Sequence, residues 1–168
     1  MRYSKEESKM IWDQNAEFWD YTMGDESNDF HRNVVRPKVT ELLNPNSSDY
    51  ILDIACGNGN YSAYLAEKGI SVVGFDYGEK MIELAKKRRK HNTDRIEFYV
   101  ADATNEISMK TLKRNRMFTK AVSNMADGFL PPSRGALVLT LWKRMRTASG
   151  KRHLTPPRRQ KPCSSSRI

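Results

Sequence analysis

The sequence predicts an α/β fold in which a parallel sheet is flanked by helices. Three apolar runs, at 50–54, 71–75 and 96–100, have the length and composition of buried strands. Between them lie stretches in which apolar residues recur at helical spacing. Strands that alternate with helices in this way form βαβ units with right-handed crossovers. The 168 residues correspond to about one domain.

The N-terminal segment 1–49 is expected to be a helical lead-in. Ser4 begins a capping-box pattern, Ser-Lys-Glu-Glu, that opens a helix. Trp12, Ala16 and Trp19 then follow at positions i, i+4 and i+7, which places them on one apolar face. We expect this face to pack on the rest of the domain.

The remaining elements follow from the same kinds of pattern. Pro37 suits the first turn of a second helix, because a proline there leaves no backbone N–H unpaired. The basic run at 86–90 is expected to be an exposed helix end whose charges complement the helix dipole. We expect a loop at 21–32, strands at 50–54, 71–75, 96–100 and 118–123, and helices at about 60–68, 79–90 and 106–113.

A glycine turn after the first strand carries the candidate site. Gly57 and Gly59 lie between that strand and the next helix, where a missing side chain lets a ligand approach the backbone. Asp76 ends the second strand, a position that hydrogen-bonds ribose hydroxyls in such folds. Asp53, four residues before Gly57, would repel a diphosphate and attract an amino group. The pattern therefore favours a nucleoside ligand that carries a positive charge and no phosphate.

The same residues resemble a known family. They are similar to the three cofactor motifs of class I S-adenosylmethionine-dependent methyltransferases, and the upstream segments resemble the lead-in of the bacterial small-molecule members. The resemblance implies a Rossmann-like sheet, S-adenosylmethionine as cofactor, S-adenosylhomocysteine as product, no metal, and a lead-in that folds over the pocket as a partial lid. It extends from about Trp12 to Met125, with motifs at Leu52–Gly59, Asp76–Met81 and Val100–Asp102, and lead-in segments at Trp12–Asp20 and Met23–Arg32.

The resemblance also implies roles for individual residues. Asp53 would interact with the methionine end of the cofactor, directly or by orienting the glycine loop. Asp76 would accept hydrogen bonds from the two ribose hydroxyls. Met81 would pack against the adenine, while Asp102 and the backbone N–H of Ala103 would read its edge. The implied cofactor-binding residues are Asp53, Ala55, Gly57, Gly59, Asp76, Tyr77, Met81, Asp102, Ala103 and Asn124.

These assignments have structural alternatives. Asp53 could only cap the turn, the glycines could be ordinary turn residues, Met81 could be a core methionine, and Asp102 could be a helix N-cap. The catalytic residue is unknown, because methyl transfer depends mainly on aligning the nucleophile with the cofactor. His31 is either a lid residue near the substrate or a surface histidine. Cys56 has no evident base partner, so we expect a small buried residue there.

Beyond Met125 the βα pattern fails. Pro131 and Pro132 fall where a crossover helix is needed, and 147–168 is rich in Arg, Pro and Ser. We hypothesise a truncated or frame-shifted C-terminus, with the shift near Ala126; translation of the other two reading frames of the gene tests this. The expected organisation is a lead-in or lid at 1–49, a cofactor-binding core at 50–125 whose sheet is incomplete on its C-terminal side, and an atypical, basic, disordered tail at 126–168.

The composition limits the possible partners and locations. The formal net charge is +9, but ten of the 29 Lys and Arg residues lie in 128–168, which contains no acid. The segment 1–127 therefore has 19 basic and 20 acidic residues, and we do not expect nucleic acid as a partner. Two distant cysteines suggest no disulfide framework or metal site. The longest apolar run, 136–142, is too short to span a membrane, so the default expectation is a cytoplasmic location.

The sequence thus predicts methyl transfer from S-adenosylmethionine to a small-molecule acceptor. One alternative is a non-catalytic, cofactor-binding or poorly folded methyltransferase remnant. A weaker one is nucleic-acid binding through the basic tail. A nicotinamide-dependent dehydrogenase is weaker still, because Asp53 lies where a diphosphate would bind. The sequence does not specify the acceptor, the atom methylated or the oligomeric state.

Overall fold

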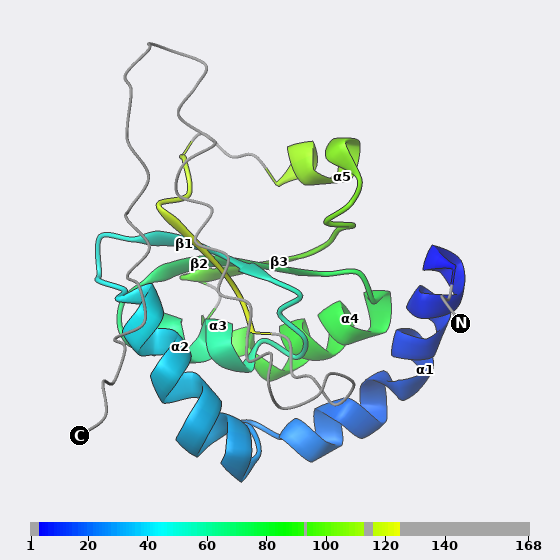
Figure 1. Ribbon diagram of the computed structural model, residues 1–168, viewed down its shortest axis with the longest axis horizontal. Coiled ribbons are helices and arrows are strands. Elements are labelled where there is room, and N and C mark those ends of the chain that lie inside the picture. The colour runs from blue at the N-terminus through cyan, green and yellow to red at the C-terminus, as the bar shows by residue number, and fades with distance from the viewer. Residues whose placement is uncertain (1–3, 93, 113–115, 125–168) are drawn as a thin grey trace, which may run out of the picture.

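The computed structural model describes residues 4–92, 94–112 and 116–124, and a parallel sheet forms the centre of this part (Figure 1). Its strands have the order β3-β2-β1-β4, and every neighbouring pair is parallel. The predicted Rossmann-like α/β class is therefore confirmed. The described strands are β1 (Tyr50–Ile54), β2 (Ser71–Asp76), β3 (Ile96–Val100) and β4 (Lys120–Ser123).

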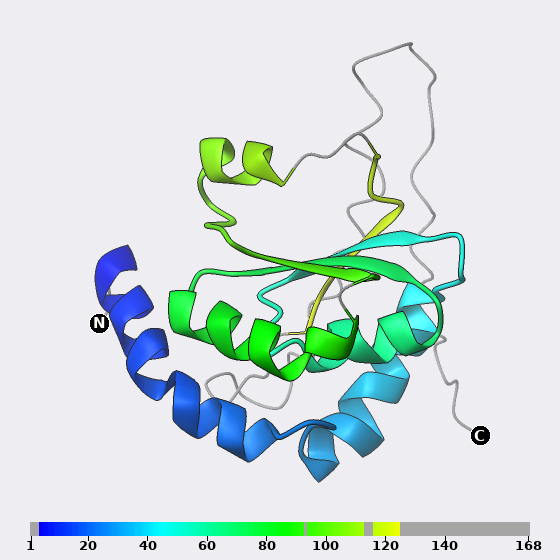
Figure 2. The same ribbon diagram turned by 180° about the vertical axis from the view of Figure 1, so that it is seen from behind.

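Helices cover both faces of the sheet in unequal numbers. In Figures 1 and 2 helices α2, α3 and α4 lie against one face, whereas α5 lies on the other. Helix α1 packs along α4, outside this layer. The described helices are α1 (Lys5–Met23), the π-helical η1 (His31–Val35), α2 (Arg36–Leu43), α3 (Asn60–Glu67), α4 (Glu79–Arg88), the 3₁₀ turn η2 (Lys90–Asn92) and α5 (Glu106–Thr111).

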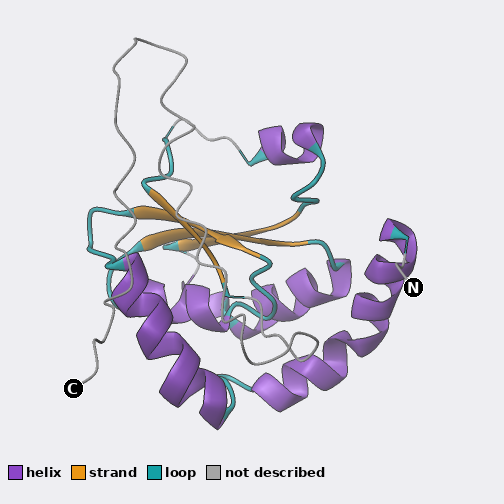
Figure 3. Ribbon diagram, in the orientation of Figure 1, coloured by secondary structure: helices purple, strands orange, loops and turns teal. Residues whose placement is uncertain are grey.

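Side chains that alternate along the strands build a core on each face. In β1, Ile51 packs with α2 and α3 residues such as Val39 and Leu65, while Leu52 faces the opposite cluster with Phe75. A strand that is buried on both faces needs apolar residues at successive positions, which explains the continuous apolar runs in the sequence. Figure 3 shows the resulting layers, with the strands between the purple helices.

Three polar contacts fix the outer strand β4 beside β1. The Asp49 carboxylate, just before β1, accepts hydrogen bonds from Lys120 Nζ at 2.7 Å and from Thr119 Oγ1 at 2.7 Å. Thr119 Oγ1 also accepts from the backbone N–H of Tyr50 at 3.0 Å. These contacts help to set the register that places Ser123 opposite Ile54, at the carboxyl end of the sheet.

The N-terminal half differs from the prediction in one segment. The capping box at Ser4 and Glu7 is present, and Pro37 lies in the first turn of α2 as expected. The predicted loop at 21–32 is wrong at both ends, however, because α1 continues to Met23 and η1 begins at His31. A proline cannot donate to the carbonyl four residues before it, and the π-helical turn immediately before α2 accommodates this missing bond, with the Arg36 N–H donating to His31 O.

The other element boundaries agree with the prediction to within two residues, and β1 and β3 match it fully. The tail 126–168 and its hypothesised frame shift lie outside the described residues, as does Cys163. In the described part of the chain, no helix combines the length and apolar character that a membrane crossing requires.

Candidate functional site

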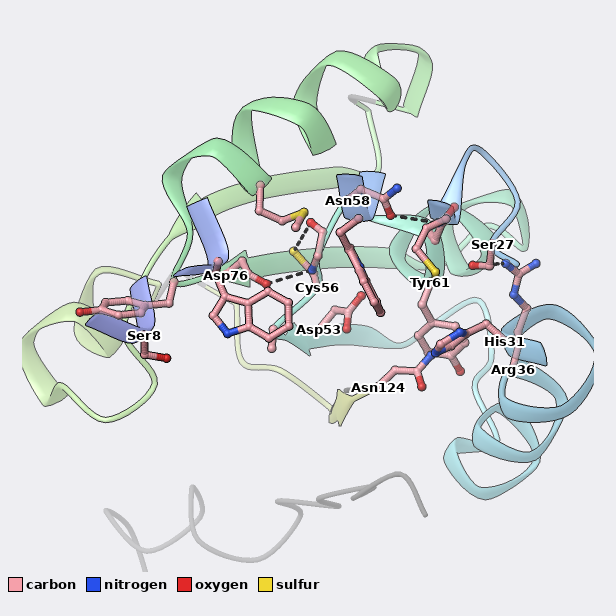
Figure 4. Close-up of a pocket in the computed structure, with 18 residues that line it drawn as sticks. Ser8, Ser27, His31, Arg36, Asp53, Cys56, Asn58, Tyr61, Asp76 and Asn124 are labelled. Carbon is pink, nitrogen blue, oxygen red and sulfur yellow. Dashed lines mark hydrogen bonds between the residues drawn. The ribbon is translucent and has the colours of Figure 1, made fainter. Parts of the chain in front are cut away.

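A cavity of about 280 Å³ lies at the carboxyl ends of β1, β2 and β4 (Figure 4). In open parallel sheets ligands bind at this edge. Figure 4 shows Asp76 toward one end of the cavity and Asn124 near His31 and Tyr61 toward the other. The cavity is lined by seven of the ten predicted cofactor-binding residues, Asp53, Ala55, Gly57, Asp76, Tyr77, Met81 and Asn124. These assignments remain predictions.

The turn after β1 adopts left-handed backbone conformations that bring the chain around the cavity. Gly57 and Gly59 have φ values of 57° and 76°, and Ala55 has a φ of 55°, which is uncommon for a residue with a side chain. At Gly57 an added Cβ would meet only Trp19 Nε1, at 3.9 Å. At Gly59 it would lie 2.5 Å from Phe98 Cζ. The two glycines therefore serve different needs, open approach at Gly57 and helix–strand packing at Gly59.

Asp76 joins the two loops at the carboxyl ends of β1 and β2. Its Oδ2 accepts a hydrogen bond from the backbone N–H of Gly57 at 3.0 Å, and its Oδ1 accepts one from Gly78 at 3.0 Å. A carboxylate offers about four lone-pair sites, so capacity remains for a ligand. Burial raises the pKa of Asp76, and the two backbone hydrogen bonds oppose this shift.

Asp53 is the most deeply buried acid of the cavity. It lies next to the last residue of β1, between Gly74 of β2 and Val122 of β4, and its exposed fraction is 1%. Ser62 Oγ of α3 donates to its Oδ2 at 2.6 Å. Burial raises the pKa of Asp53 to about 7; the Ser62 hydrogen bond lowers it, and the charge of Asp76 raises it further. The cavity thus contains a carboxyl group that titrates near neutrality.

Asn124 adds an unpaired acceptor to the same cavity. Its Oδ1 is buried and has no hydrogen-bond partner among the described residues. A buried acceptor that lacks a donor is unfavourable by about 1–3 kcal/mol. Together with Asp53 and Asp76, Asn124 makes the cavity rich in acceptors, so an occupant that supplies several donors would suit it.

Three predicted residues lie outside the cavity lining: Gly59, Asp102 and Ala103. Asp102 Oδ1 accepts from the backbone N–H and from the hydroxyl of Thr104, both at 2.7 Å. The alternative of Asp102 as a helix N-cap is wrong, because Asn105 caps α5. The predicted adenine contacts of Asp102 and Ala103 stay predictions.

The aromatic face of α1 forms one wall of the cavity. Trp12 and Trp19 meet edge to face, with ring centroids 6.3 Å apart, and both line the cavity together with Met23. His31 is also buried and lines the cavity, so the surface alternative is wrong. Burial, followed by the nearby charge of Arg36, lowers the pKa of His31.

A polar network behind the cavity was missed by sequence reasoning. Asn58 of the glycine turn donates through Nδ2 to Asp20 Oδ1 at 3.0 Å, and Arg88 Nη2 donates to Asp20 Oδ2 at 2.9 Å. Burial alone would raise the pKa of Asp20, but the hydrogen bonds from Arg88 and Asn58 outweigh it and lower the pKa. The basic run 86–90 is therefore only partly the solvated helix end that was expected, because Arg88 is paired and Arg89 is buried.

Cys56 lies in the cavity lining but is not set up as a nucleophile. Burial raises the pKa of the Cys56 thiol well above its usual value, and the charges of Asp53 and Asp76 raise it further. Its Sγ contacts the carbonyl oxygen of Gly57 at 3.7 Å. Within the described residues, no group of three or more potential metal-ligating side chains gathers.

With this geometry the chain can be compared with known proteins. A methyltransferase domain family matches residues 45–132, which is more than half of the chain. The chain belongs to this methyltransferase domain family. The resemblance to class I S-adenosylmethionine-dependent methyltransferases is therefore confirmed.

Two relatives match parts of the chain. The 23S rRNA (uracil(1939)-C(5))-methyltransferase RlmD of Marinomonas sp. (strain MWYL1) is 35% identical over 100 residues, or 59% of this chain and 21% of that protein. The demethylmenaquinone methyltransferase of Clavibacter sepedonicus is 44% identical over 69 residues, or 41% of this chain and 28% of that protein. The chain thus spans less than a third of the length of either relative.

A solved structure supports the fold. The Haemonchus contortus phosphoethanolamine N-methyltransferase 1, in complex with phosphoethanolamine and S-adenosylhomocysteine, aligns with a TM-score of 0.54 and 20% sequence identity. The alignment covers 70% of this chain and 24% of that one. At this identity the likeness concerns the fold alone.

The two turn glycines should respond differently to substitution. Gly59→Ala combines a strained positive φ with a clash against Phe98, and we expect it to lower the free energy of unfolding by about 2–4 kcal/mol. Gly57→Ala carries only the backbone strain, about 1–2 kcal/mol. Urea unfolding of the two variants measures the difference. Equal losses would contradict the packing role of Gly59.

Asp53→Asn should stabilise the chain at alkaline pH. The pKa of Asp53 is about 7 in the folded state and about 3.9 in an unfolded chain. Between these values the folded state binds more protons, so the unfolding free energy falls as pH rises, and the loss is complete above pH 7. The variant has no ionisable group at this position and avoids the loss. We therefore expect its free energy of unfolding to exceed that of wild type by about 1–4 kcal/mol at pH 8. Urea unfolding at about pH 5 and 8 measures it; a variant that is less stable than wild type at pH 8 would contradict the assignment.

Proposed function

We propose that this chain binds S-adenosylmethionine in the cavity at the carboxyl edge of the sheet and transfers its methyl group to a small-molecule acceptor. The observation that carries the proposal is the pair of carboxylates in a single cavity, Asp53 buried and Asp76 half-buried. Two such groups favour a cationic ligand with hydroxyl donors and disfavour a phosphate. S-adenosylmethionine has an ammonium, a sulfonium, a ribose and no phosphate.

The residues of the cavity suit the parts of this cofactor. Asp76 retains lone pairs for the two ribose hydroxyls after accepting from Gly57 and Gly78. Asp53 and the unpaired Asn124 Oδ1 would receive the ammonium group. The same carboxylates would repel the diphosphate of a nicotinamide dinucleotide, which argues against a dehydrogenase.

Comparison with relatives adds support. A protein of the same fold, the phosphoethanolamine N-methyltransferase, was solved with S-adenosylhomocysteine bound. Family membership gives the expectation of the same cofactor here.

The chain would contribute to catalysis by aligning the cofactor with the acceptor and by excluding water from the cavity. The cofactor supplies a methyl group that its sulfonium has already activated. Asp53, Asp76 and the glycine turn would fix its orientation, and Trp12 and Trp19 of α1 would cover it. Holding two reactants in line accounts for much of the rate of such a transfer, so no general base is assigned.

A small-molecule acceptor is favoured by two observations. The demethylmenaquinone methyltransferase of Clavibacter sepedonicus, named for a small-molecule acceptor, is 44% identical over its matched part. In addition, residues 1–127 are nearly neutral, with 19 basic and 20 acidic residues, whereas RNA binding depends on a strong positive field.

RNA is the second candidate acceptor, because several relatives are named as 23S rRNA uracil methyltransferases and another, from Pyrococcus abyssi, as a tRNA uracil methyltransferase. Transfer of radiolabelled methyl groups to an unmodified 23S rRNA transcript tests it. We expect no transfer above the background of Asp76→Ala. Salt-sensitive transfer to the transcript would replace the small-molecule proposal with an RNA one.

Calorimetric titration with S-adenosylhomocysteine tests the cofactor site. We expect saturable binding by wild type and a loss of at least about ten-fold in affinity for Asp76→Ala, which removes acceptors for two hydroxyls. Asp94→Ala, at an exposed acid outside the cavity, is the matched control. A folded wild-type chain that binds NADH but not S-adenosylhomocysteine would overturn the proposal. Binding without turnover on any acceptor would support the non-catalytic alternative.

The affinity should also depend on pH. Without ligand, Asp53 is largely protonated below pH 7, since its pKa is about 7. An ammonium group prefers the ionised carboxylate, so we expect the affinity for S-adenosylhomocysteine to rise by up to about ten-fold per pH unit toward pH 7 and then to level off. Asp53→Asn should remove this dependence. Equal pH profiles for variant and wild type would contradict the role of Asp53.

A further inference from the structure

Helix α1 is a cavity wall with little buried apolar surface. Among its described side chains, the buried ones are Ala16, Asp20 and Met23. Phe18 and Tyr21 are 69% and 85% exposed. A helix with so few buried apolar contacts has a low local stability and can open without unfolding the domain. Its attachment must therefore depend on polar contacts.

Polar contacts link α1 to α4 along their length. Near the N-terminus of α4, Asp13 Oδ1 of α1 accepts a hydrogen bond from the backbone N–H of Lys80 at 3.1 Å. Two ion pairs in this region are exposed: Lys9 Nζ lies 2.5 Å from Glu79 Oε1, and Lys80 Nζ lies 3.6 Å from Glu17 Oε1. Such surface pairs contribute about 0–1 kcal/mol. They cannot account for much of the attachment.

The contact at the C-terminal end of α1 is of a different kind. The Arg88 guanidinium binds the Asp20 carboxylate through Nε and Nη2, and Nη2 also donates to the carbonyl oxygen of Asp20 at 3.2 Å. Asp20 is 8% exposed. The two side chains are 23% and 12% exposed, and a two-pronged arginine–carboxylate pair that is largely shielded from solvent is stronger and more specific in geometry than a surface pair. Asp25 adds a fourth oxygen from an exposed side chain, 2.7 Å from Arg88 Nη1.

This ion pair is connected to the glycine turn. Asn58 Nδ2 donates to Asp20 Oδ1, and it lies 3.3 Å from the carbonyl oxygen of Gly24. Asn60 Nδ2 donates to Asn58 Oδ1 at 2.9 Å. From the other side, Arg89 donates to Asn60 Oδ1 at 2.5 Å and to the carbonyl oxygen of Asn58 at 3.4 Å. Asn58 itself lines the cavity, whereas Arg88 and Arg89 do not.

We propose that the Asp20–Arg88 ion pair is a latch that holds α1 closed over the cofactor cavity, so that Arg88 is a positioning residue for a ligand it does not touch. The proposal rests on the proposed function, since the ligand is S-adenosylmethionine or S-adenosylhomocysteine. With the latch formed, the cavity face of α1, with Trp12 and Trp19, stays over the glycine turn. With it open, α1 moves away and the ligand can leave.

Hydrogen exchange and ligand release test the latch in the full-length chain. Arg88→Met removes the pair, and Lys87→Met, at an exposed neighbour on the same helix, is the matched control. We expect Arg88→Met to accelerate amide exchange in α1 by at least ten-fold while leaving exchange in β1 unchanged. We also expect it to raise the dissociation rate constant of S-adenosylhomocysteine by at least ten-fold, with no such change in Lys87→Met.

Further variants keep the test informative if Arg88→Met does not fold. Asp20→Asn has nearly the same shape and should give the same effects, and the double variant should be no worse than either single one, because both remove one interaction. Arg88→Lys keeps the charge without the two-pronged geometry and should give an intermediate dissociation rate. Asp25→Asn should resemble wild type.

Four results would overturn one of the two proposals. Unchanged α1 exchange in Arg88→Met would show that the pair does not hold the helix. Faster α1 exchange with an unchanged dissociation rate would show that α1 does not gate the ligand. A wild-type chain that is folded but does not bind S-adenosylhomocysteine would overturn the proposed function, whereas binding by wild type with no difference among the variants would overturn the latch alone.

Discussion

The placement of two carboxylates at the carboxyl edge of a parallel sheet, Asp53 buried and Asp76 half-buried, is the constraint on which the rest of the structure depends. Asp53 lies in the central strand, out of water, with one hydrogen bond from Ser62. An apolar residue there would pack better, since desolvating an acid is unfavourable unless something compensates it. The raised pKa values of Asp53 and Asp76 reflect the unfavourable removal of their carboxylates from water. Sites that sacrifice stability in this way are commonly functional.

The surrounding elements make this edge possible. The left-handed turn through Gly57 directs a backbone N–H at Asp76, and Gly59 leaves room for Phe98, which fixes α3 on the sheet. Helix α1 then closes the cavity from outside through the network of Asp20, Arg88 and Asn58. The backbone conformation of the glycine turn, the packing of α3 on the sheet and the attachment of α1 thus all depend on residues in or next to this turn.

Much of the sheet and part of the candidate site could be predicted from the sequence, because the patterns that indicate them are local. Apolar runs and the glycine turn follow one another in the sequence, and parallel pairing brings Asp53 and Asp76 to the same edge. The latch was missed because Asp20 and Arg88 lie 68 residues apart and a basic run at a helix end resembles a solvated one. The sequence left His31 open between a lid residue and a surface histidine, because the helix that carries it begins within the predicted loop.

A crystal structure of the chain with S-adenosylhomocysteine would test the central claim most directly. The account predicts the ribose hydroxyls within hydrogen-bonding distance of the Asp76 carboxylate, and the ammonium group near Asp53 and Asn124 Oδ1. It also predicts Trp12 and Trp19 over the ligand. A ligand bound elsewhere, or in the cavity with its ribose away from Asp76, would contradict it.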